Sequence, residues 1–163
     1  MGRKAASGGT PATRALERAG IGFTSLPYVH DPGASSYGLE AAAELGLDPQ
    51  RVLKTLLADV DGHLVVALVP VAGQLDLKAL AAAAGGKRAA MADRATAERV
   101  TGYVVGGISP IAQKRQLATF VDRSALEHTT VYVSGGKRGL DLGLAPQDLI
   151  DVLGARTADL RRD

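Results

Sequence analysis

Three short segments of this chain hold the residues best suited to chemistry. In the first, residues 52–57, a single lysine, Lys54, stands in an otherwise apolar run and is followed by Thr55. Such a cation either extends its ammonium group from the edge of a sheet or meets a phosphate or a polarised carbonyl at a pocket wall. The residue pattern leaves both interpretations of Lys54 open.

The second segment, residues 101–110, places Gly106 and Gly107 directly before Ile-Ser-Pro. Glycine allows the backbone to approach a ligand closely and to offer it N–H and C=O groups. A bulge or a tight turn at a strand end explains the same pair equally well. Gly106 and Gly107 are therefore candidates for ligand contact, with a structural alternative.

The third segment, residues 133–139, combines glycines with cations after a strand-like run. Its members are Ser134, Gly135, Gly136, Lys137, Arg138 and Gly139, and Asp141 follows two residues later. A plain β-turn explains the glycines but not the cations among them, which favour a loop that faces phosphate. The three segments together predict a pocket built from backbone groups, hydroxyls and one lysine, without an evident nucleophile.

Composition excludes several kinds of chemistry. The 163 residues include no Cys, so the protein has no disulfide, thiolate nucleophile or Cys-ligated zinc. The three histidines, His30, His63 and His128, are not at ligand spacing, so we expect no metal and no cofactor. Nucleotide-binding, zinc-protease and nucleophile-elbow motifs are missing, and the residue order neither favours nor excludes a Ser-His-Asp triad. No apolar run is long enough to cross a membrane, and we expect a cytoplasmic protein.

The charge balance is mildly basic, with a formal net charge of +2 and a pI of about 9.0. That is too little to identify a nucleic-acid-binding protein by itself. Three basic pairs stand beside glycine or polar residues: Lys87-Arg88, Lys114-Arg115 and Lys137-Arg138. Each pair alone is explained by a solvated turn, and only their recurrence in three loops favours contact with nucleic acid.

Capping residues and turn residues predict the elements that must position these segments. Helices are expected from Pro11 to Gly20 and over residues 35–45, 77–84, 93–100 and 146–154. Strands are expected over residues 23–30, at a sheet edge because of Pro27, and over 52–60, 64–69, 117–121, 129–133 and 140–144. Asp61-Gly62 predicts a hairpin. The mixed order predicts one α/β domain of the α+β type over residues 10–163, after a flexible tail of residues 1–9.

The motifs resemble those of the YbaK family, which comprises bacterial Cys-tRNA(Pro) deacylases related to the editing domain of prolyl-tRNA synthetases. The resemblance covers residues 10–160 and is strongest in Gly-Gly-Ile-Ser-Pro at 106–110 and Val-Ser-Gly-Gly-Lys-Arg-Gly at 133–139. It implies a single domain with a mixed, barrel-like sheet flanked by helices. It also implies a trans-editing hydrolase for Cys-tRNA(Pro) that acts in a transient complex with prolyl-tRNA synthetase.

The resemblance also implies a site. Catalytic positions are Lys54, Gly106 and Ser134; substrate-binding positions are Tyr28, Tyr37, Thr55, Gly107, Gly135, Gly136 and Asp141; tRNA-binding positions are Lys87, Arg88, Lys114, Arg115, Lys137 and Arg138. In the implied mechanism the substrate thiol attacks its own ester, the backbone at 106–107 stabilises the oxyanion and Lys54 holds the ester or a phosphate. Tyr37 stands where the family more often has Phe, and Leu39 replaces an acidic residue, which bears on amino-acid specificity.

Two other functions remain open at this point. A related enzyme would remove Ala or Ser from tRNA, with water or a ribose hydroxyl as the nucleophile. A non-catalytic protein would bind aminoacyl-tRNA or a nucleotide in the same pocket. The joint presence of Lys54, both glycine-rich loops and Asp141 disfavours the non-catalytic binder.

Overall fold

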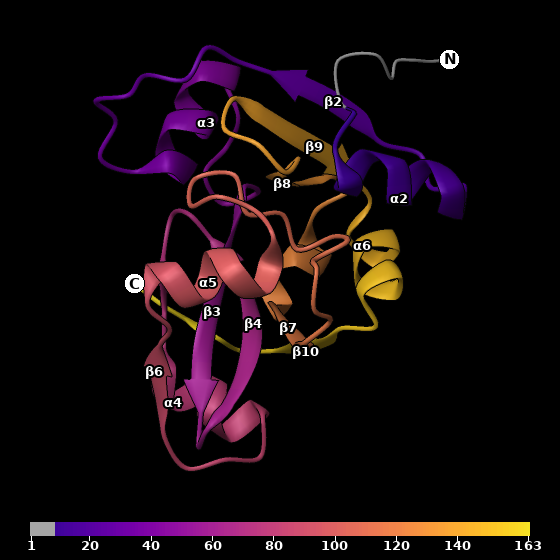
Figure 1. The fold of residues 1–163 in the computed structure, drawn as a ribbon. Coiled ribbons are helices and arrows are strands. Elements are labelled where there is room, and N and C mark those ends of the chain that lie inside the picture. The colour runs from indigo at the N-terminus through magenta and orange to yellow at the C-terminus, as the bar shows by residue number, and fades with distance from the viewer. Residues whose placement is uncertain (1–8) are drawn as a thin grey trace.

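The structure, a computed structural model, describes residues 9–163, so the predicted tail of residues 1–9 lies outside the described residues apart from Gly9. The described chain folds as one α/β domain (Figure 1). Its helices are α2 (Pro11–Ala19), α3 (Tyr37–Leu45), α4 (Leu77–Ala83), α5 (Arg94–Thr101), α6 (Pro146–Leu153) and the 3-10 helix η1 (Arg123–Glu127). Its strands are β2 (Thr24–Pro27), β3 (Leu53–Val60), β4 (His63–Pro70), β5 (Gln74–Leu75), β6 (Ala89–Met91), β7 (Ala118–Asp122), β8 (Val131–Ser134), β9 (Leu140–Leu144), β10 (Arg156–Ala158) and β11 (Arg161–Arg162).

The helices begin and end within two residues of the predicted bounds; α3, for example, begins at Tyr37 rather than at residue 35. The Thr10 hydroxyl accepts a hydrogen bond from the N–H of Thr13 before α2, and Gly20 ends α2 in the left-handed conformation, with φ 70°. Asp76 and Asp93 cap α4 and α5 in the same way through their carboxylates. Local sequence alone therefore sets these boundaries.

Three sheets form the framework. The largest has the strand order β10-β7-β4-β3-β6, a second pairs β2, β9 and β8 in that order, and a third pairs β11 with β5. The predicted hairpin is confirmed, because Val60 pairs with His63 and the two turn residues have positive φ, 51° at Asp61 and 90° at Gly62. The strand that contains Pro27 lies at a sheet edge, as predicted.

The expectation of a barrel-like sheet is wrong, since none of the sheets within residues 9–163 closes into a barrel. The largest sheet ends at β10 on one side and at β6 on the other. Strand β6 is too short to continue the edge of β3, which it pairs only from Ala58 to Val60. The β2-β9-β8 sheet meets β3 at one isolated bridge, Val52 to Tyr132, so the sheets touch without joining.

The core lies on both faces of the five-stranded sheet. Alternate residues of β4 point to opposite faces, so Val66 and Leu68 pack with α2, α5 and α6, whereas Val65 and Val69 pack with α4. The first of these two clusters also contains the inner residues of β8 and β9 and thus connects the two larger sheets. Figure 1 shows the three-stranded sheet beside α3 and above the larger sheet, with α5 in front of β3 and β4.

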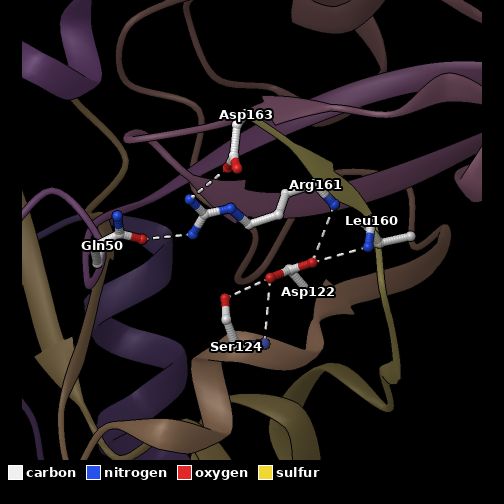
Figure 2. Close-up of polar contacts among 6 residues, drawn as sticks. All are labelled: Gln50, Asp122, Ser124, Leu160, Arg161 and Asp163. Carbon is white, nitrogen blue, oxygen red and sulfur yellow. Dashed lines mark hydrogen bonds and ion pairs between the residues drawn. The ribbon is translucent and has the colours of Figure 1, made fainter.

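The end of the chain is attached by Asp122, which is 3% exposed at the end of β7. One carboxylate oxygen accepts hydrogen bonds from the N–H groups of Leu160 (2.8 Å) and Arg161 (3.2 Å). The other accepts from the N–H and the hydroxyl of Ser124, as Figure 2 shows. These contacts hold β10 and β11, two short strands that the sequence did not predict; β5 and β6 were missed too. No helix within the described residues is long and apolar enough to span a membrane.

Candidate active site

A cavity of about 390 Å³ opens along the free edge of β3. It exists because β6 pairs with β3 only from Ala58 onward, which leaves the edge of β3 from Leu53 to Leu57 without a neighbouring strand. Every residue from Val52 to Leu57 lines the cavity, so side chains from both faces of the strand reach it. The cavity is also lined by parts of α3 and α5, by the loop after α5 and by β8 and β9. Its size is in the range typical of ligand pockets.

Two polar side chains of β3 line this cavity without partners. The ammonium group of Lys54 makes neither a hydrogen bond nor an ion pair within residues 9–163, and burial lowers its pKa. The hydroxyl of Thr55 is buried and has no hydrogen-bond partner there either. A buried polar atom without a partner is costly, so both groups are available to a polar ligand.

Strand β9, which lies between β2 and β8, supplies a third group without a partner, the carboxylate of Asp141. In register, Asp141 of β9 lies between Leu26 of β2 and Ser134 of β8, and Tyr28 follows Leu26 by two residues. Tyr28, Ser134 and Asp141 all line the cavity. Burial raises the pKa of Asp141 to about 7. Burial, together with the nearby Asp141 carboxylate, raises the pKa of Tyr28 to about 12, so the Tyr28 hydroxyl stays protonated at neutral pH.

Gly106 also lines the cavity, next to Tyr37 and Arg138. Its φ is 92°, and a Cβ atom there would lie 2.7 Å from the ring of Tyr37 and 3.0 Å from the Arg138 guanidinium. Arg138 fastens this part of the lining because it donates to the carbonyl of Val105 (2.8 Å) and lies over the Tyr37 ring. The Gly106 N–H has no partner within the described residues, whereas the Gly107 N–H donates to Val104. Of these two glycines, only Gly106 can therefore offer its N–H to a ligand without giving up an existing bond within the described residues.

The other predicted glycines do not line the cavity and instead allow loops to pack. A Cβ atom at Gly107 would lie 2.7 Å from the backbone of Lys137. At Gly135 it would meet Leu140, and at Gly136, where φ is 103°, it would meet the ring of Tyr103. These contacts explain the glycines as packing residues that join the loop after α5 to the β8–β9 loop.

None of the six residues of the three predicted basic pairs lines the cavity. The N–H groups of Lys87 and Arg88 donate to Asp61 at the tip of the β3–β4 hairpin. Lys114 and Arg115 are exposed and bonded through their backbones to the end of α5. Of the third pair, Arg138 does not line the cavity but contacts two residues that do, Tyr37 and Val105.

Sequence reasoning missed several lining residues, among them Ser36, Met91 and Arg94. Ser36 and Arg94 lie at the starts of α3 and α5, where the capping pattern was visible but no ligand role was suspected. Four exposed apolar side chains line the cavity or directly follow or precede lining residues: Val29, Leu39, Met91 and Val104. Of these four, Met91 lines the cavity itself, and the other three are neighbours of lining residues in the chain.

The cavity lining contains hydroxyls and three charged side chains, Lys54, Arg94 and Asp141, and it contains no His, Cys or Glu. Within residues 9–163, no group of three or more metal-ligating side chains is close enough to hold an ion. No Ser-His pair can therefore form in the lining itself. The arrangement is suited to holding a polar, partly charged ligand and to donating a backbone N–H to a developing negative charge.

Comparison with known proteins identifies the family. The family described as the aminoacyl-tRNA editing domain matches residues 31–152. A protein of Enterococcus faecalis named, provisionally, Cys-tRNA(Pro)/Cys-tRNA(Cys) deacylase EbsC is 33% identical, over 98% of both chains. Among solved structures, the hypothetical protein APE2540 superposes with a TM-score of 0.82 and 27% identity, over 93% of this chain and 99% of that one. A protein described, provisionally, as a trans-editing enzyme for prolyl tRNA synthetase shares the fold, with a TM-score of 0.80 and 24% identity over 94% and 96% of the two chains. The chain therefore belongs to the aminoacyl-tRNA editing domain family, the YbaK-like editing deacylases whose motifs it resembles.

Proposed function

We propose that this protein removes cysteine that has been esterified by mistake to tRNA(Pro), and that the thiol of the substrate is the nucleophile. The observation that carries the proposal is the composition of the cavity. It holds unpartnered polar groups in Lys54, Thr55 and Asp141 but no Cys and no His, so the lining offers neither a protein thiol nor a Ser-His pair. An ester that brings its own thiol supplies what the lining lacks.

The reaction has two parts. The sulfur of the cysteinyl group attacks its own ester carbonyl; a C–S bond forms, the bond from the carbonyl carbon to the ribose oxygen breaks, and the thiol proton passes to that oxygen. The products are free tRNA and a strained cysteine thiolactone, which water then opens to cysteine. The protein contributes by holding thiol and carbonyl in a reactive geometry, a proximity effect whose upper range is about 10⁵–10⁸ M in effective molarity.

Three groups of the chain have roles in this step. The Gly106 N–H, which has no partner of its own, donates to the oxyanion that develops on the carbonyl. Lys54 holds the ester or the terminal phosphate as a point charge. Met91, an exposed apolar side chain of the cavity lining, offers a contact surface for an unstacked base of a single-stranded 3′ end.

The test is a panel of tRNA(Pro) esters of cysteine, serine and alanine, assayed with and without prolyl-tRNA synthetase. Serine is nearly isosteric with cysteine, and pocket shape alone discriminates such a pair by about 10²-fold or less. We expect a larger ratio in favour of the cysteinyl ester. Equal rates for the cysteinyl and seryl esters would refute attack by the thiol. A rate increase with the synthetase present would support the transient complex that we propose.

The alternative is editing of seryl-tRNA, and one observation favours it. The buried Thr55 hydroxyl has no partner, and a seryl hydroxyl would satisfy it better than a thiol, which is a weak donor and acceptor. In that case water or a ribose hydroxyl attacks the ester. A Thr55→Val variant separates the two functions: it should lower activity toward the seryl ester much more than toward the cysteinyl ester if serine is the natural substrate.

A further inference from the structure

Two aspartates of this protein are buried in strands, and their surroundings differ completely. Asp122 is 3% exposed, and its two oxygens accept hydrogen bonds from Ser124, Leu160 and Arg161, so its charge is compensated (Figure 2). Asp141 is 5% exposed, and its carboxylate has no hydrogen bond or ion pair within residues 9–163. Burying a carboxylate in this way is costly unless a partner arrives.

That partner must come through the cavity. Asp141 is the second residue of β9, where it pairs with β2 on one side and β8 on the other, and it lines the cavity. Lys54 lines the same cavity but forms no ion pair with it. Tyr28 is close enough for the Asp141 charge to raise the pKa of its hydroxyl, and it adds no positive charge. The protein itself therefore leaves a place for a cation next to Asp141.

An aminoacyl ester carries one cation, its α-ammonium group. We propose that Asp141 binds this α-ammonium group, so that the cavity selects esters of free amino acids and rejects esters whose amino group is missing or acylated. The inference rests on the proposed function and adds the recognition of the backbone amino group to it. The raised pKa of the Asp141 carboxyl group is consistent with this role, because burial disfavours the ionised carboxylate and a bound ammonium group would favour it.

The selection has a chemical consequence. Every aminoacyl-tRNA has the free amino group, whereas peptidyl-tRNA and N-formylated initiator tRNA have it blocked. A carboxylate at this place lets an editing enzyme act on newly charged tRNA without cleaving the esters that carry growing chains. Selectivity for the side chain of the amino acid then depends on the rest of the cavity, including Thr55 and Tyr37.

The experiment removes the amino group without adding bulk. The substrates are Cys-tRNA(Pro) and 3-mercaptopropionyl-tRNA(Pro), which keeps the thiol and the ester but lacks the amine. The proteins are the wild type, Asp141→Asn and the control Asp159→Asn, whose carboxylate is 84% exposed and pairs only with Arg123. Binding is measured in parallel with adenosine analogues that carry the same two acyl groups at the 3′ position through a stable amide.

For the wild type and Asp159→Asn we expect kcat/KM to fall about 100-fold when the amine is removed, and the Kd of the amide analogue to rise by the same factor. An effect of this size is usual for the loss of one charged hydrogen bond. For Asp141→Asn we expect a difference below about threefold, because the partner of the amine is gone. Equal use of both esters by the wild type would overturn the inference, as would full discrimination by Asp141→Asn. An Asp141→Asn variant that is equally slow on both esters, with a wild type that ignores the amine, would show that Asp141 is a general base instead.

The two proposals fail separately. If the wild type cleaves neither ester, the proposed function fails, and the amide analogues still decide whether Asp141 binds the amine. If the wild type cleaves both esters equally, cysteine editing stands and the amine inference falls.

Discussion

Asp141 offers a direct test of the electrostatics of the cavity, because its carboxyl group is buried without a partner in the free protein. Changing it to asparagine keeps the shape of the side chain and removes the charge. The effect on stability depends on pH, since burial raises the pKa of Asp141 from 3.8 to about 7. At about 1.36 kcal/mol for each pKa unit, this rise corresponds to about 4 kcal/mol.

The sign follows from proton binding. Between pH 4 and pH 7, approximately, the folded protein keeps the Asp141 proton that the unfolded chain has released, so the contribution to stability is complete below about pH 4 and is lost as the pH rises through about 7. Asparagine at position 141 cannot ionise, so the variant does not lose stability in this way as the pH rises. The free energy of unfolding of Asp141→Asn should therefore rise relative to the wild type by up to about 4 kcal/mol between pH 4 and pH 8.

The assay is urea denaturation of both proteins at several pH values, followed by linear extrapolation. Asp159→Asn is the control, because its carboxylate is exposed and solvated and should show no such trend. A difference between Asp141→Asn and the wild type that does not change with pH would refute the reasoning. It would show that some group of the protein already compensates the Asp141 charge.

Four further predictions concern activity, packing, the chain end and tRNA binding. Lys54→Ala should lower deacylation about 100-fold in a protein that unfolds at the wild-type urea concentration, because a positioned charge in a site is worth a few kcal/mol; turnover near that of the wild type would contradict its role. Gly107→Ala should destabilise the fold by about 1–3 kcal/mol, because the added Cβ would lie 2.7 Å from the backbone of Lys137, whereas Gly22→Ala, which has open space around it, should be neutral in the same denaturation assay. Asp122→Ala should cost about 3 kcal/mol or more in the same assay, since the N–H of Leu160 loses its acceptor; a loss below about 1 kcal/mol would show that water replaces the carboxylate. The affinity for tRNA should fall with salt, but less steeply than the loss of about 10³–10⁵ between 50 and 200 mM that six to ten phosphate contacts produce; a flat response in filter binding would show that the basic pairs only face solvent.

Local sequence determined most of the secondary structure. Caps such as Asp76 and Asp93 and the turn at Asp61-Gly62 were predicted correctly because each acts on the few residues beside it. The strands β5, β6, β10 and β11 were missed because they are two or three residues long. Such strands form only where a strand from a distant part of the sequence pairs with them, and a run of two or three residues is too short to show a strand pattern.

The resemblance to a known family supplied the candidate site, and the residues alone supplied only its three segments. Seven of the implied positions do line one cavity: Tyr28, Tyr37, Lys54, Thr55, Gly106, Ser134 and Asp141. The glycines at 107, 135 and 136 do not line the cavity, and a Cβ atom at each would meet a neighbouring residue; sequence could not show this, because a glycine beside a ligand and a glycine beside a packed loop look alike in a sequence.

Only the tertiary structure decided which charged groups are available. Asp122 and Asp141 both lie in apolar strands; the sequence beside Asp122 supplies Ser124 as a local partner but does not show that residues near the end of the chain also compensate its charge. Folding brings the N–H groups of Leu160 and Arg161 to Asp122 and brings no partner to Asp141. Solvation and pairing depend on residues that are distant in the chain, whereas caps and turns depend on adjacent ones. The position of the cavity has the same origin, since it lies where β6 ends and the edge of β3 is left open.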